Sequence, residues 1–160
     1  MRFLLFFVSI LCIQEHAFAQ NCYSADSLAQ HLLTAIQSKD FKELQKLQPT
    51  VGVIKQNFGK ELGALSNENI QKMISENPKT TQDWEKIQKD AVAAKIDLNK
   101  LTVSSFKIER VYGDDNPLVG LNISLKEGNK TYQIAIACIE SEECFYFNEF
   151  LKSIGVWVSK

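Results

Sequence analysis

Two residue types able to perform chemistry follow the N-terminal segment: one histidine, His31, and the cysteines Cys22, Cys138 and Cys144. A general base needs a positioned partner and a metal site needs several ligands, but the chain has no HxxxH, HExxH or CxxC spacing. Cys22 has no base near it in sequence except His31, so an activated thiolate is not indicated. The sequence therefore predicts no catalytic residue, no metal site and no cofactor, and we expect His31 at the surface or core boundary.

Cys138 and Cys144 are the cysteines expected to form a disulfide. Cys138 ends one alternating apolar segment and Cys144 begins another, so five intervening residues could place the two opposite each other. Cys22 would then be unpaired. A two-residue turn at Ser141-Glu142 would instead oppose Cys138 to Phe145 and free either cysteine to meet Cys22, and this alternative stays open.

Polar groups that could hold a ligand occur between residues 110 and 116. Asp114-Asp115-Asn116 offers oxygen ligands in a turn, but the twelve-residue calcium-loop pattern is missing, which favours an ordinary hairpin turn. Arg110 could grip an acidic ligand or form a salt bridge with a helix carboxylate. Tyr112 adds an aromatic ring with a polar tip, suited to a pocket or to a core.

Two phenylalanines, Phe145 and Phe147, alternate with Cys144, Tyr146 and Phe150. If the latter three face the helices, Phe145 and Phe147 face away. They would then form a partner surface or lie beneath the C-terminal segment around residues 154–158. Arg110, Tyr112, Phe145 and Phe147 are therefore the candidate pocket or partner residues.

Residues 1–19 resemble a cleavable signal peptide, with Arg2 before an apolar run that extends from Phe3 to Ile13 and Ala17-Phe18-Ala19 at its end. We expect the mature chain to begin at Gln20 and to be secreted or periplasmic. A lipid anchor on Cys12 is the alternative, although Leu11 precedes it. The run is shorter than the roughly twenty residues of a membrane-spanning helix.

Cleavage leaves residues 20–160, 141 residues that we expect to form a single domain. It removes one base and one acid, Arg2 and Glu15, so the net charge stays at −1. This balance does not favour nucleic acid as a partner. An unidentified protein or a small apolar ligand is expected instead, with the chain monomeric or weakly self-associating.

Residue periodicity divides the mature chain into a helical half and a strand half. Apolar residues recur at helical spacing from Ser24 to Ser38. Further helices are predicted after Asp40, after Ser66, and from about Thr80 to about Ile96, whereas residues 50–65 are ambiguous. Alternation begins after Leu101.

A hairpin is predicted around the turn Gly128-Asn129, because odd residues from 119 to 125 and even residues from 132 to 138 are apolar. This register pairs Leu125 with Tyr132 and Ile123 with Ile134. A strand over residues 103–112, another over 144–151 and a short fifth over 156–158 complete the pattern. The sequence thus predicts an α+β fold, with N-terminal helices packed on one face of a C-terminal antiparallel meander sheet of four or five strands.

The opening helix followed by Ser38-Lys39-Asp40-Phe41-Lys42-Glu43-Leu44 resembles the start of many NTF2-like and cystatin-like proteins. The segment from Ala94 to Leu101 resembles small exported bacterial proteins of unknown function. The first resemblance implies helices packed into the concave face of a curved sheet. It implies no active-site residue, because that fold group contains enzymes, binding proteins and structural modules.

These observations favour a small exported protein that binds a partner without catalysis. The alternative is a small enzyme or small-molecule binder with a pocket between sheet and helices, using groups such as Asp97, Arg110 or Tyr112. A third hypothesis is a structural component of the envelope. A closed apolar core would favour the interaction protein, and a deep pocket with converging polar groups would favour the enzyme.

Overall fold

The computed structural model describes residues 22–110 and 112–157, with backbone alone for 153–157. The predicted signal peptide lies outside these residues. The first helix, α1 (Ala25–Ser38), begins at Ser24, whose hydroxyl accepts a hydrogen bond from the Ser27 amide. Its buried face carries seven apolar residues. Beyond it, Lys39 has a left-handed conformation, with φ of 55°, which ends the helix.

Four further α-helices and a 3₁₀ helix follow: α2 (Phe41–Gln45), α3 (Val51–Leu62), α4 (Asn67–Ser75), α5 (Pro78–Ala93) and η1 (Leu98–Lys100). Each begins after a polar residue whose side chain accepts a backbone hydrogen bond: Asp40, Thr50, Ser66, Asn77 and Asp97. The ambiguous segment thus contains a helix, α3, with a kink at Phe58.

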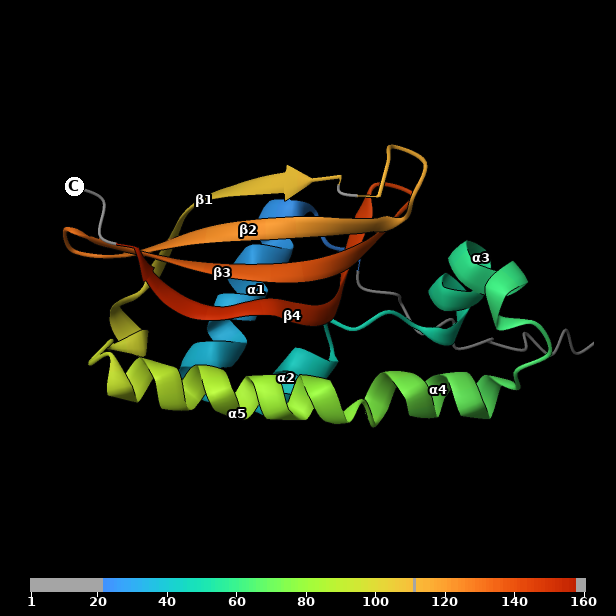
Figure 1. Cartoon of the computed structure of the whole chain (residues 1–160), viewed down its shortest axis with the longest axis horizontal. Helices are drawn as coiled ribbons and strands as arrows, with labels where there is room; N and C mark the ends of the chain where they lie inside the picture. The colour runs from blue at the N-terminus through green and yellow to red at the C-terminus, as the bar shows by residue number, and fades with distance from the viewer. Residues whose placement is uncertain (1–21, 111, 158–160) are drawn as a thin grey trace, which may run out of the picture.

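The strands are β1 (Thr102–Glu109), β2 (Leu118–Glu127), β3 (Lys130–Ser141) and β4 (Cys144–Trp157), and they form one antiparallel sheet in the order β1-β2-β3-β4. The α+β class and the meander are confirmed (Figure 1). The prediction of a separate fifth strand was wrong, because residues 156 and 157 continue β4.

The hairpin between β2 and β3 has the predicted register: Leu125 lies opposite Tyr132 and Ile123 opposite Ile134. Gly128 has a φ of 58°, a conformation that glycine adopts without steric cost. The turn chemistry therefore fixes which face of both strands is buried.

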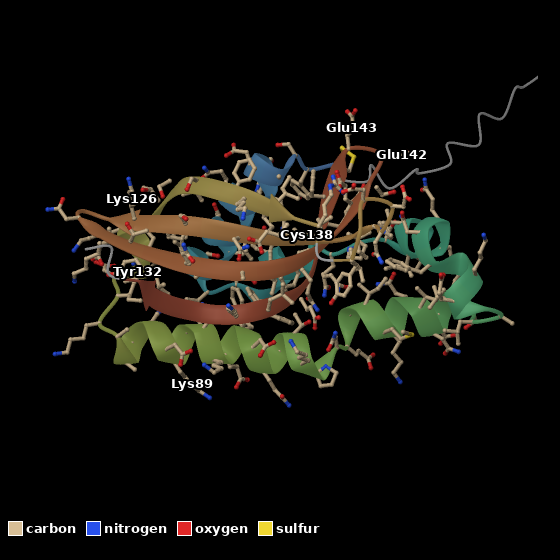
Figure 2. The ribbon with its side chains drawn as sticks, turned by 45° about the horizontal axis from the view of Figure 1, so that its top comes forward. Lys89, Lys126, Tyr132, Cys138, Glu142 and Glu143 are labelled. Carbon is tan, nitrogen blue, oxygen red and sulfur yellow. A yellow bond between two sulfur atoms is a disulfide. The ribbon has the colours of Figure 1, made fainter. Side chains whose placement is uncertain are left out.

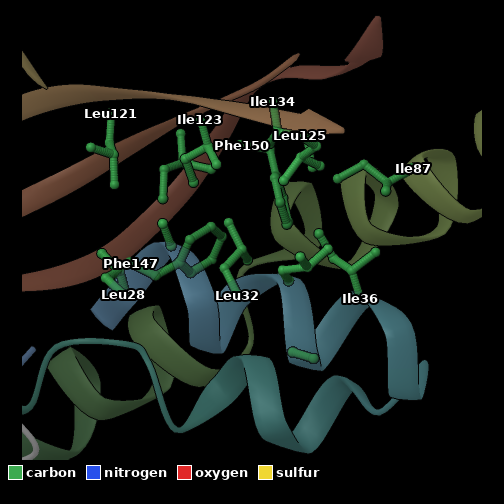
Figure 3. Packing of buried hydrophobic residues seen from close by; sticks show 14 of the residues in the cluster. Leu28, Leu32, Ile36, Ile87, Leu121, Ile123, Leu125, Ile134, Phe147 and Phe150 are labelled. Atoms are coloured by element: carbon green, nitrogen blue, oxygen red, sulfur yellow. The ribbon is translucent and has the colours of Figure 1, made fainter. Parts of the chain in front are cut away.

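The main hydrophobic core lies between the sheet and the helices α1, α2 and α5 (Figure 3). Leu28, Leu32 and Ile36 project from α1 toward the sheet, and Ile87 joins them from α5. Strand residues in the same cluster include Leu121, Ile123, Leu125, Ile134, Phe147 and Phe150. The layer between sheet and helices is thus filled by apolar side chains.

A β-bulge in β4 decides which of its aromatic side chains enter this core. Ala137 pairs with Glu149 and Cys138 with Phe147, which leaves Asn148 as an extra residue. The bulge reverses the alternation, so Phe145 and Phe147 are buried in the main core and are not a partner surface. Their predicted outward orientation was wrong because the prediction assumed unbroken alternation.

The opposite face of the sheet has a smaller core at one end. Tyr146 and Cys144 pack there with Ile139 and with Val53 of α3. α3 therefore covers the end of the sheet face that α1 and α5 do not cover.

Candidate functional site

The disulfide joins Cys22 to Cys144, with a distance of 5.0 Å between their α-carbons, and the predicted pairing of Cys138 with Cys144 was wrong. The β3–β4 turn contains two residues, Glu142 and Glu143, and Ser141 lies opposite Cys144. This register places Cys138 on the main core side and Cys144 on the opposite face, so they cannot meet.

Cys138 is a free cysteine with no exposed surface. Burial raises the pKa of its thiol far above the usual value, because the surrounding core does not solvate a thiolate. The thiol is therefore a core side chain without nucleophilic character.

An open groove of about 610 Å³ lies where the β1–β2 loop, the β3–β4 hairpin and α3 meet. Its lining consists of polar and charged residues except for Pro117: Gln56, Asn57, Arg110, Asp114, Asp115, Asn116, Glu140, Ser141, Glu142 and Glu143. We refer to these residues with Pro117 as the acidic groove. The volume falls within the range typical of ligand sites, roughly 300 to 1,000 Å³.

Five carboxylates and one guanidinium line the acidic groove. Arg110 is paired with Glu140 through two contacts of 2.6 and 2.9 Å, which neutralises one carboxylate. Asp114 interacts electrostatically with Arg110 at longer range. Among the described residues, no lysine, arginine or histidine nitrogen lies within 4.0 Å of the carboxylates of Asp114, Asp115, Glu142 and Glu143. The groove therefore has an excess of negative charge, although the whole chain carries a net charge of only −1.

Hydrogen bonds from α3 hold the hairpin side of the groove. Gln56 Nε2 donates to Glu142 Oε1 at 2.7 Å, and Asn57 Nδ2 donates to Ser141 Oγ at 3.0 Å. The Cys22–Cys144 disulfide ties the next residue of the hairpin to the start of the described chain. Beside it, the Phe145 amide donates to the Tyr23 carbonyl at 2.8 Å.

The turn itself contains two glutamates in left-handed conformations, with φ of 51° at Glu142 and 66° at Glu143. A two-residue hairpin turn of the I′ type needs positive φ at both positions, which asparagine and glycine adopt more readily. In Figure 2 both glutamates lie at the tip of this hairpin. Both glutamates thus adopt a left-handed backbone conformation that is unfavourable for this residue type.

The predicted candidate residues separate in the structure. Arg110 lines the acidic groove, whereas Tyr112 has a 69% exposed side chain and is not among the lining residues. Asp97 pairs with Lys100, which interacts with Glu127 at the β2–β3 end of the sheet, away from Arg110. The three groups named for an enzyme do not converge. His31 packs against Tyr23, with 5.0 Å between ring centres.

Asp114-Asp115-Asn116 was interpreted as an ordinary turn, yet all three residues line the acidic groove. Glu140, Glu142 and Glu143 line the same groove, and sequence spacing gave no indication that their hairpin meets the β1–β2 loop. Within residues 22–110 and 112–157, no group of three or more His, Cys, Asp or Glu side chains is arranged to hold a metal ion.

A second, smaller pocket of about 180 Å³ lies between α3, α4 and β4. Apolar side chains of Ile54, Ile70 and Met73 line it together with Asn148. It is smaller than typical ligand sites.

In the part of the chain that the structure describes, no helix has the length and apolar character needed to cross a membrane. Comparison of the chain with known proteins found no matching protein family, curated protein or solved structure. The resemblance to NTF2-like and cystatin-like proteins therefore stays a prediction.

Proposed function

We propose that this protein is a non-catalytic binding domain whose acidic groove holds a basic segment of a partner protein. Four carboxylates of the groove lie outside the Arg110–Glu140 pair, and this excess of negative charge carries the proposal. An extended chain with lysine or arginine side chains supplies the complementary charges. The open shape of the groove suits a peptide segment better than an enclosed small molecule. The filled layer between sheet and helices supports binding at this surface over an enzyme that uses an internal cavity.

The groove would act mainly on the rate of association and on partner choice. Exposed charges contribute little affinity individually, but a concentration of one sign steers an oppositely charged partner. Binding should therefore weaken as ionic strength rises, because salt screens exposed charges beyond about 8 to 10 Å.

The test uses a fluorescent peptide of alternating lysine and glycine, titrated with the protein at low ionic strength and followed by anisotropy. We expect the double variant Asp115→Asn, Glu142→Gln to bind about tenfold more weakly, because it removes two of the carboxylates that face the peptide. Glu68→Gln, Glu85→Gln is the matched control, since it removes the same charge from exposed positions on α4 and α5. The control should bind within about twofold of the parent chain.

Two results would contradict the proposal. One is the absence of binding by the parent chain at low salt. The other is an equal loss of affinity in the groove variant and in the control, which would indicate only the effect of total charge.

We further propose that the protein acts outside the cytoplasm after removal of residues 1–19. The Cys22–Cys144 disulfide supports this, because such bonds persist in oxidising compartments. N-terminal sequencing of exported material should give Gln20 or a neighbouring residue as the first. Recovery of Met1, or of a lipid on Cys12, would contradict export by this route.

A further inference from the structure

Considering the described residues alone, the sheet has one uncovered edge, formed by β1. The other edge strand, β4, lies beside α5, and Lys79 Nζ of that helix donates to the Phe150 carbonyl at 3.0 Å. In Figure 1, β1 is the outermost strand, and none of the described helices or strands runs along its outer side. An uncovered edge presents unpaired backbone amides and carbonyls that can pair with another strand.

Only the second half of β1 is regular enough to pair. The register with β2 shifts between Val103 and Ser105, so a bulge at Ser104 interrupts the first half. From Ser105 to Glu109 the pairing with β2 is continuous. Phe106 lies opposite the buried Ile123, but its side chain is 39% exposed, since β1 has no neighbour on its outer side.

We propose that two copies of this chain pair antiparallel through their β1 edges, about a two-fold axis at Ile108, to form a continuous eight-stranded sheet. Lys107 then faces Glu109 of the second copy, and Glu109 faces Lys107 of the second copy. Ile108 faces its own symmetry mate. A two-fold interface repeats each contact, so one favourable charge pair occurs twice.

Charge and geometry select this register over its neighbours. A two-fold axis perpendicular to the sheet keeps the two core faces on the same side, so a residue must oppose one an even number of positions away. An axis at Lys107 would place two lysines directly opposite each other, which is destabilising. An axis at Phe106 would bring the bulge at Ser104 into the paired segment.

Within one chain, Lys107 Nζ and Glu109 Oε1 are 3.0 Å apart on the exposed face of β1. This alternation of charge along the edge makes the strand complementary to itself when a second copy runs antiparallel. The net charge of −1 offers little repulsion between copies. Because the paired segment is short, we expect weak, concentration-dependent dimers.

The test is sedimentation velocity over a concentration series extending to the millimolar range, at low ionic strength. We expect Lys107→Glu and Glu109→Lys each to weaken dimerisation about tenfold, because both turn two opposite-charge pairs into two like-charge pairs. The double variant Lys107→Glu, Glu109→Lys restores complementarity in the same register and should recover dimerisation to within about threefold of the parent.

Lys89→Glu is the matched control, since it makes the same charge change at an exposed position of α5 (Figure 2). It should leave the dimerisation constant within about twofold of the parent value. Circular dichroism checks that each variant is folded. The proposal would be overturned by a parent chain that is monomeric throughout the series, by a double variant that stays as weak as the single ones, or by an equal loss in Lys89→Glu.

Discussion

Cys144 shows how strongly one backbone detail determines a side chain's partner. It lies one residue beyond a two-residue turn, and this position sends its sulfur to the face of the sheet that Cys22 reaches. The side chain of Cys138 points to the other face of the sheet and is enclosed in the main core. Of two cysteines six residues apart, Cys144 therefore forms a disulfide and Cys138 remains a free, buried thiol.

The disulfide is expected to contribute strongly to stability. It closes a loop across a sequence separation of 122 residues, and the chain-entropy model assigns a loop of this size about 4 to 5 kcal/mol. Cys22→Ser should therefore lower the free energy of unfolding by up to about 4 kcal/mol in urea titrations of the chain that begins at Gln20.

Cys138→Ala provides the matched control, because it removes a cysteine but keeps the disulfide. It should cost only about 1 kcal/mol for the lost packing of a small side chain. In the parent chain, a thiol reagent should label Cys138 in denaturant and no cysteine in the native state. A native-state label on Cys138, or equal stability of Cys22→Ser and the parent, would contradict the disulfide assignment.

At the level of elements, local residue types predict the β2–β3 hairpin but not the β3–β4 hairpin. Gly128-Asn129 has the residues that a tight turn prefers, and apolar alternation on both sides gives the same register independently. Glu142 and Glu143 adopt positive φ without such residues. The disulfide partner and the burial of Phe147 were therefore both predicted wrongly. The bulge at Asn148, which brings Phe150 to the same core face as Phe147, has no local sequence mark either.

The acidic groove was only partly predictable for a related reason. Arg110 was identified as a ligand-binding candidate from its charge, and it does line the groove. The groove exists because the β1–β2 loop meets a hairpin about thirty residues later in the chain, and this contact depends on tertiary packing. A single sequence gives no local pattern for such a contact.

The same substitution is expected to have opposite effects at two glycines. Gly128→Ala should lower the free energy of unfolding by about 1 kcal/mol, because φ of 58° is unfavourable for alanine. Gly59→Ala should raise it by about 0.5 to 1 kcal/mol, because this helical position has no neighbouring atom within 4 Å of an added methyl group. Urea denaturation of both variants measures the difference, and equal effects would contradict the turn geometry.

At the scale of the whole molecule, α4 buries far fewer side chains than α5. We call the sheet with α1, α2 and α5 the body of the protein. The helix α5 buries Thr80, Trp84, Ile87 and Ala91, whereas α4 buries only Ile70. Met73, on α4, is 58% exposed. Segments with few buried contacts open at lower free energy than the rest of a protein, so α4 should open independently of the body.

Two isoleucine truncations separate these regions. Ile87→Ala should lower the global free energy of unfolding by about 2 to 5 kcal/mol, since its side chain is fully enclosed by the main core. Ile70→Ala should mainly accelerate amide hydrogen exchange in α4, with a smaller effect on global unfolding. Hydrogen exchange followed by mass spectrometry measures both. Equal losses of global stability would show that α4 unfolds together with the body.

The strand β4 contributes side chains to two cores, and the extra residue at Asn148 lets Phe147 and Phe150 enter the same one. Upstream of it, the strand is out of phase with the segment that follows, much as an inserted base shifts a reading frame. Removing Asn148 would make Glu149 and Phe147 neighbours opposite Ala137 and Cys138, so the strand would alternate regularly with Phe145, Phe147 and Phe150 still on the core face. The face that Cys144 presents to Cys22 is set by the two-residue turn before it, so the covalent attachment of Cys22 does not depend on the extra residue.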